Sequence, residues 1–191
     1  MDAHAHLDEK GLEGFVAALT SSGPEICVIS NSVDHESSQR NLELSELSPK
    51  IIPFVGIHPD LFRLDSNEKE VTPDLLDSMV NGVQDLAGRS YGIGEIGLDP
   101  KYGSNREQEK LFQEMLAISE KTGLPSSIHN RNSVSRILEI VSTFTLKGSV
   151  LLHWFAGTEQ ELAEIGDRGM FVSFGPSILT SKRMRGLVEK T

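Results

Sequence analysis

The chain has 191 residues, of which 38% are hydrophobic and 24% are charged, and its formal net charge is −10. This is the composition of an ordinary globular protein, and we expect residues 1–191 to form a single domain. No run of about 18 apolar residues is present, which argues against a membrane-spanning helix. The only cysteine, Cys27, excludes a disulfide within the chain and favours a reducing, cytoplasmic location.

Short apolar runs alternate with amphipathic stretches along the chain. The predicted strands are, in order, Met1–His6, Ile26–Ser30, Ile51–Ile57, Tyr91–Glu95, Ser126–His129, Val150–His153 and Met170–Ser173. The predicted helices are Leu12–Ser21, His35–Leu47, Pro73–Ala87, Arg106–Thr122, Ser133–Phe144, Glu159–Arg168 and Ser181–Lys190. Strands that alternate with helices in this way predict βαβ units and a parallel sheet.

Two architectures fit this alternation, a doubly wound open sheet and a (β/α)₈ barrel. A barrel needs about 250 residues, so this chain is short of one by about a strand and a helix or two. Polar residues bear on the choice, because five of the six histidines lie at the ends of predicted strands. The ends of parallel strands meet on one face, which in barrels carries the active site. Both architectures stay open on this evidence.

The predicted strand ends carry the residue types of a metal site. His4 and His6 are two residues apart, so both side chains point the same way from a strand. Glu95, His129 and His153 arrive from three other strands. Imidazole and carboxylate donors suit zinc first, with manganese or magnesium as alternatives. These donors outnumber the three that one catalytic zinc uses, whereas two ions bridged by a carboxylate would use all of them.

Each of these residues also has a simpler explanation. A buried histidine is usually hydrogen-bonded within the core, and Glu95 can pair with an arginine. The convergence of all five residues on one predicted rim favours a shared site.

The same motifs, in this order, resemble the TatD-type metal-dependent deoxyribonucleases within the amidohydrolase-like barrel superfamily. The resemblance runs through the whole chain. It rests on Asp2-Ala3-His4-Ala5-His6-Leu7-Asp8, Gly56-Ile57-His58-Pro59, Gly92-Ile93-Gly94-Glu95-Ile96-Gly97-Leu98-Asp99, Ile128-His129-Asn130-Arg131 and His153-Trp154-Phe155-Ala156-Gly157.

This resemblance implies a TIM-type (β/α) barrel of which seven βα units are visible and the eighth strand is missing from the chain. It also implies a hydrolase that cleaves phosphodiester bonds in DNA with up to two divalent ions per chain. It implies that His4 and His6 bind the first metal and that His129 and His153 bind the second. Glu95 then bridges the two ions as the catalytic carboxylate. His58 and Arg131 are implied to face the phosphate of the substrate.

The chain departs from the family pattern near its end. The family continues with an eighth strand whose aspartate binds the first metal and serves as general base, whereas the last aspartate here is Asp167, in a predicted helix. We therefore expect weakened catalysis and open barrel edges through which the chain can self-associate. Trp154 also stands where the family often has cysteine, and Trp154 and Phe155 are candidates to contact a base. Lys182, Arg183 and Arg185 can face a nucleic-acid backbone.

Two other functions stay open at this point. One is an amidohydrolase-like enzyme that cleaves a C–N or an ester bond, and the other is a metal-binding barrel without catalysis. The amidohydrolase class usually places a lysine where this chain has Glu95, which favours the phosphodiesterase.

Overall fold

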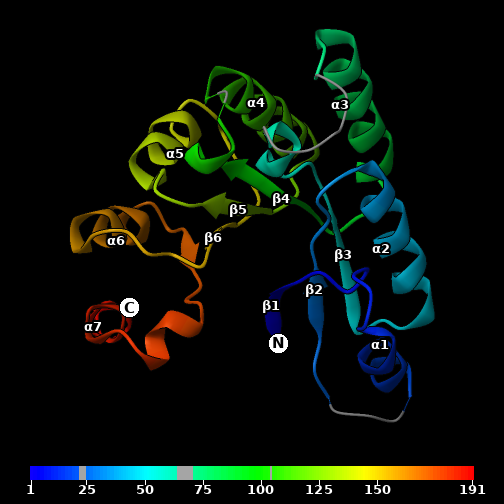
Figure 1. Ribbon diagram of the computed structural model, residues 1–191, viewed down its shortest axis with the longest axis horizontal. Coiled ribbons are helices and arrows are strands. Elements are labelled where there is room, and N and C mark those ends of the chain that lie inside the picture. Colours follow the sequence, from blue (N-terminus) through cyan, green and yellow to red (C-terminus); the bar gives the residue numbers. More distant parts are fainter. Residues whose placement is uncertain (22–24, 64–70, 104) are drawn as a thin grey trace.

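The computed structural model describes residues 1–21, 25–63, 71–103 and 105–191. Seven parallel strands form one sheet in the order β1-β2-β3-β4-β5-β6-β7. The sheet curls into part of a barrel with the helices on its outside (Figure 1). The strands are β1 (Asp2–Ala5), β2 (Val28–Ser30), β3 (Ile51–Val55), β4 (Gly92–Leu98), β5 (Ser126–Asn130), β6 (Val150–His153) and β7 (Phe171–Val172).

A helix follows each strand, as the sequence predicts. The helices are α1 (Glu13–Thr20), α2 (His35–Leu47), α3 (Pro73–Ala87), α4 (Asn105–Thr122), α5 (Val134–Val141), α6 (Glu159–Asp167) and α7 (Lys182–Val188). Side-chain caps fix several starting points: Asp34 and Thr158 form capping boxes before α2 and α6, and Thr72 caps α3 ahead of Pro73. The TIM-type prediction is confirmed, with seven strands in a half-barrel.

Three short 3₁₀ helices were not predicted. They are η1 (Pro59–Phe62), η2 (Pro100–Tyr102) and η3 (Pro176–Leu179), and they follow β3, β4 and β7. Each begins at a proline, whose fixed φ and missing N–H suit the first position of a helical turn. These turns shape the face of the barrel on which the strands end.

The prediction that the fourth strand ends at Glu95 is wrong. β4 continues to Leu98, and all its residues are buried. A register irregularity lies between Ile93 and Ile96, after which Ile96, Gly97 and Leu98 pair with Ile128, His129 and Asn130 of β5. The sequence signal was ambiguous because a strand interrupted by glycines reads like a strand end.

Two apolar clusters hold the curl. The larger one joins the central strands to the helices outside them and includes Ile93, Ile96, Phe112, Met115, Ile128, Ile137 and Leu152. The smaller one lies beside α1 and consists of Leu7, Val16, Leu19, Val28 and Ile51. In the described ranges, no helix is long and apolar enough to cross a membrane.

β1 and β7 are the edges of the sheet. Among the residues that the structure describes, β1 pairs with β2 alone and β7 pairs with β6 alone. Self-association through these edges stays a prediction.

Candidate active site

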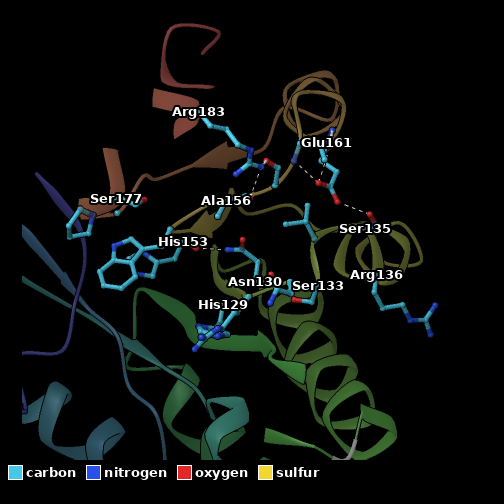
Figure 2. A pocket seen from close by; sticks show the side chains of 18 residues that line it. His129, Asn130, Ser133, Ser135, Arg136, His153, Ala156, Glu161, Ser177 and Arg183 are labelled. Carbon is cyan, nitrogen blue, oxygen red and sulfur yellow. Dashed lines mark hydrogen bonds between the residues drawn. The ribbon is translucent and has the colours of Figure 1, made fainter. Parts of the chain in front are cut away.

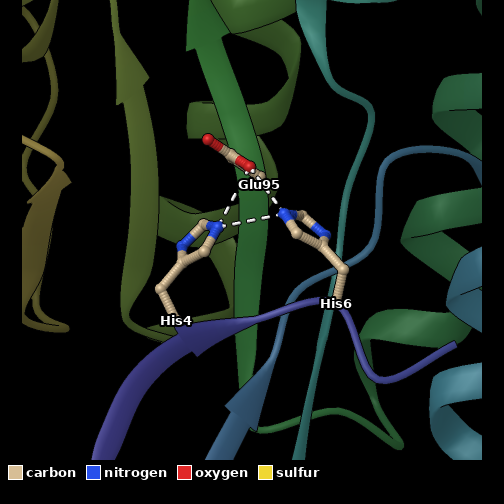
Figure 3. A group of neighbouring side chains, drawn as sticks. All are labelled: His4, His6 and Glu95. Carbon is tan, nitrogen blue, oxygen red and sulfur yellow. Dashed lines mark hydrogen bonds and ion pairs between the residues drawn. The ribbon is translucent and has the colours of Figure 1, made fainter. Parts of the chain in front are cut away.

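The five predicted metal donors lie together where the strands end. His4 is in β1, His6 is one residue beyond that strand, His129 is in β5, and His153 is the last residue of β6. Glu95 lies inside β4 rather than at its end, and only 3% of its surface is exposed. Figure 3 shows His4 and His6 turned from β1 toward Glu95.

The two oxygens of Glu95 face two different groups of imidazoles. Oε2 lies 3.1 Å from Nε2 of His4 and 3.2 Å from Nε2 of His6, and these two nitrogens are 3.2 Å apart. Oε1 lies 3.0 Å from Nδ1 of His129 and 4.0 Å from Nε2 of His58. The structure therefore joins two groups of three possible donors through one carboxylate. Within the described residues, all the ion-pair partners of Glu95 are histidines, with no arginine among them.

Each imidazole is held by a partner on the ring nitrogen that faces away from Glu95. Nδ1 of His6 donates to the backbone oxygen of Asn31 over 3.0 Å, and Nε2 of His129 donates to Oδ2 of Asp99 over 3.1 Å. Nδ1 of His4 lies 3.1 Å from Oγ of Ser127. Partners of this kind fix the ring and the tautomer of metal-binding histidines.

The donor set fits a divalent cation on the chemistry of its lone pairs. Because the carbonyl of Asn31 and the carboxylate of Asp99 only accept, a neutral His6 or His129 presents a lone pair to an oxygen of Glu95. A lone pair beside an ionised carboxylate is repulsive unless a proton or a cation lies between them. A cation between these atoms would remove that repulsion.

The electrostatics of the cluster favour a proton at the same position. Burial alone would lower the pKa of His6 and that of His129, but the Glu95 carboxylate raises both pKa values above the ordinary one. Burial alone would likewise raise the pKa of Glu95, yet hydrogen bonds from His129, His4 and His6 hold that pKa well below its usual range. Metal binding at these nitrogens therefore competes with protonation.

His153 meets the cluster differently. Its ring stacks on that of His4, with ring centroids 3.4 Å apart and planes 9° apart, and its Nδ1 lies 3.1 Å from Oγ of Ser173. Burial, reinforced by repulsion from His4, lowers the pKa of His153 to about 3. A neutral ring with Nδ1 engaged leaves Nε2 as its free nitrogen. The structure groups His58, rather than His153, with Glu95 and His129.

His58 has two contacts at Nδ1 that favour different tautomers. This nitrogen lies 3.2 Å from the backbone N–H of Asp60, which would place the proton of the neutral ring on Nε2, and 2.9 Å from Oδ1 of Asp60, which favours a proton on Nδ1. Nε2 lies 4.0 Å from Oε1 of Glu95. It can therefore act as a hydrogen-bond donor in one tautomer and as a metal ligand in the other.

Close backbone packing under the cluster explains the glycines of the β4 motif. A Cβ on Gly97, whose φ is +142°, would lie 2.1 Å from the carbonyl oxygen of His129. A Cβ on Gly94 would lie 2.6 Å from Oδ1 of Asn31. These positions let β4 approach β5 and the segment after β2, which brings Glu95 within reach of His6 and His129.

A pocket of about 860 Å³ opens beside the cluster (Figure 2). His129, His153, Arg131, Trp154 and Arg183 are among the residues that line it. Arg131 is exposed and has no partner in the part of the chain that the structure describes. Arg183 instead donates to the backbone oxygens of Ala156 and Gly157, so part of its guanidinium is already engaged.

The structure gives different results for the other side chains that were predicted to contact nucleic acid. Phe155 is fully buried and packs against Phe174, so the expectation that it contacts a base is wrong. Arg185 donates to the backbone oxygens of Ile178 and Leu179. Arg183 and Arg185 therefore stabilise the loops that follow β6 and β7.

Sequence reasoning missed the residues that orient the imidazoles. Asp99 is the clearest case, since it is 1% exposed and its carboxylate holds His129. Its place as the last residue of the motif Gly92–Asp99 was the available signal. Ser127, Ser173 and the backbone of Asn31 gave none, because their contacts depend on tertiary placement.

Over residues 1–191, the sequence matches the family described as TatD related DNase. An uncharacterized metal-dependent hydrolase of Methanocaldococcus jannaschii is 23% identical over 191 residues, which span 99% of this chain and 72% of that protein. A deoxyribonuclease of Homo sapiens is 24% identical over 200 residues, spanning 100% of this chain and 73% of that protein.

A 3′-5′ ssDNA/RNA exonuclease of Salmonella typhimurium is 27% identical over 179 residues, spanning 91% of this chain and 65% of that protein. The crystal structure of a TatD homologue from Escherichia coli superposes with a TM-score of 0.81 at 22% identity, covering 100% of this chain and 74% of that one. That likeness establishes the barrel fold. Because the family match spans the whole sequence, the chain belongs to the TatD related DNase family.

Proposed function

We propose that this protein is a metal-dependent hydrolase that cleaves phosphodiester bonds in DNA, with Glu95 shared between two divalent cations. One observation carries the proposal: the two oxygens of a single buried carboxylate face separate histidine groups. Relatives named as a deoxyribonuclease and as an ssDNA/RNA exonuclease support nucleic acid as the substrate.

The donors divide between the two cations. His4 and His6 would hold the first ion with Oε2 of Glu95, and His129 and His153 would hold the second with Oε1. Zinc suits imidazole and carboxylate donors best, with manganese and magnesium as alternatives. A cation held there would polarise a phosphoryl oxygen and acidify a water molecule.

The side chains of the protein then have separate tasks. Burial alone would raise the pKa of Glu95. Hydrogen bonds from the histidines nevertheless hold this pKa well below its usual range, so Glu95 stays ionised. Asp99 keeps the proton of His129 on Nε2, so that Nδ1 keeps a lone pair with which it can bind a metal ion. In the tautomer with its proton on Nε2, His58 donates to a phosphoryl oxygen, and Arg131 binds a second one from the pocket side.

A cytoplasmic location is part of this proposal. It rests on Cys27, which is a free thiol and therefore suits a reducing compartment.

The test compares Glu95→Gln with the wild type. The amide keeps the volume of the side chain but loses the charge that two cations share, so we expect at most one metal per chain and a loss of DNA hydrolysis of at least about 100-fold. Elemental analysis gives the metal content, and cleavage of a labelled oligonucleotide gives the activity.

Glu46→Gln is the matched control, because Glu46 is exposed and pairs with Arg89 on the surface. Its metal content and activity should equal those of the wild type. Two metals per chain in Glu95→Gln would contradict the shared carboxylate. Hydrolysis of amide or ester substrates, but not of DNA, by the same wild-type preparation would contradict the phosphodiesterase.

A further inference from the structure

An exposed aromatic side chain stands beside the proposed metal site. Trp154 directly follows His153 at the end of β6, and 58% of its surface is exposed. Its ring centroid lies 5.0 Å from that of His153, with 29° between the planes. His153 stacks in turn on His4, so three rings form a row that leads outward from the metal donors. An indole that only filled the core would be buried.

The indole is held in place by backbone geometry. Trp154 has φ +48°, in the left-handed region that bulky residues rarely adopt. Its backbone N–H donates to Oγ of Ser173 over 3.1 Å. A Cβ on Gly175 would lie 2.9 Å from Cγ and Cδ2 of the indole, so the ring lies against this glycine. An uncommon conformation that exposes a large apolar ring points to a ligand.

The surroundings of Trp154 match a nucleotide. The ring lines the pocket of about 860 Å³ together with His129, His153 and the exposed guanidinium of Arg131. The pocket thus combines an aromatic face, a cation and the imidazoles. An aromatic ring beside a cationic groove is the arrangement with which proteins bind unpaired bases and their phosphates.

We propose that Trp154 is the stacking platform for an unpaired base of the DNA strand whose phosphate lies at the histidine cluster. The inference rests on the proposed function. A base in a duplex has both faces covered by its neighbours, so the platform selects single-stranded DNA. Stacking on one aromatic ring changes affinity by about 5- to 150-fold.

Trp154 is the only tryptophan of the chain, which gives a direct measurement of binding. The probe is a ten-nucleotide strand of deoxythymidine with phosphorothioate linkages, which resist hydrolysis. We expect it to quench the fluorescence of Trp154 in the metal-loaded chain. A strand of the same length and linkages with abasic units should leave the fluorescence unchanged, because it offers phosphates without bases.

A second experiment compares variants. It measures the Kd of each variant for the same two strands by the fluorescence anisotropy of a dye attached to the strand. Trp154→Ala should raise the Kd for the deoxythymidine strand about tenfold and leave the Kd for the abasic strand unchanged. Trp154→Phe, which keeps an aromatic face, should restore most of the affinity. The control is Tyr91→Ala, since Tyr91 is also an exposed aromatic residue but precedes β4 at the other end of the sheet.

The outcomes separate this inference from the proposed function. Equal Kd values for wild type and Trp154→Ala, or equal quenching by both strands, would overturn the stacking platform even if the chain hydrolyses DNA. Quenching by the deoxythymidine strand and a weaker Trp154→Ala would support the platform even if no hydrolysis were detected.

Discussion

The substitution Gly97→Ala tests whether the close approach of β4 to β5 builds the site. Gly97 lies opposite His129 in the sheet with φ +142°, and a Cβ there would lie 2.1 Å from the carbonyl oxygen of His129. A backbone conformation that side chains rarely adopt costs about 1–3 kcal/mol. Forcing a methyl group into a packed interior costs about 1–3 kcal/mol more. We therefore expect a loss of about 2–6 kcal/mol in the free energy of unfolding.

The same methyl group has the opposite effect at Gly166. This glycine lies inside α6, is exposed, and has no atom within 4 Å of an added Cβ. Gly166→Ala should therefore stabilise the chain by about 0.5–1 kcal/mol. Urea unfolding of both variants and of the wild type measures the two effects. A change of less than about 0.5 kcal/mol for Gly97→Ala would refute the close-packing argument, because ordinary surface substitutions change stability by that much.

Two further predictions concern the histidines. His58→Asn should raise the KM for DNA about tenfold without changing the metal content, because one charge-assisted hydrogen bond to phosphate is lost; a loss of metal in this variant would make His58 a ligand. His153→Asn tests the pH dependence of stability in chelator-treated protein. Burial and repulsion from His4 lower the folded pKa of His153 to about 3, so below pH 6.5 the unfolded state binds more protons and the wild type loses stability as the pH falls toward 3. Urea unfolding at pH 7 and pH 5 should show the wild type losing up to about 2 kcal/mol relative to His153→Asn. The raised pKa values of His6 and His129 act with the opposite sign but are common to both proteins. Equal losses in both proteins would show that His153 titrates normally.

The order of elements was predictable because it depends on local pattern. The helices His35–Leu47 and Pro73–Ala87 have the predicted bounds, and the structure shows them capped by Asp34 and Thr72. The histidines were predictable as a group because parallel strands end on one face, and that rule needs no side-chain detail.

The inner geometry of the site was not predictable. The extension of β4 beyond Glu95 depends on a register irregularity and on the positive φ of Gly97. A glycine at this point of the sequence is equally compatible with a turn, so the sequence does not show that the strand continues. The contact of Asp99 with His129 and the stacking of His153 on His4 depend on rotamers set by tertiary packing. Residues that orient ligands carry no spacing rule, so they are found only once the fold is known.

The metal donors and the curl of the sheet depend on each other. β1 is separated from β4 by β2 and β3, and a flat sheet would place these strands about 14 Å apart, since neighbouring strands lie about 4.8 Å apart. Nε2 of His4 nevertheless lies 3.1 Å from Oε2 of Glu95. β1 and β6 are farther apart in the sheet order, yet the rings of His4 and His153 are in contact. The side chains thus close the arc between strands that share no backbone hydrogen bonds. A cation bound by His4, His6 and Glu95 would tie β1 to β4 at the point where the curl brings them together.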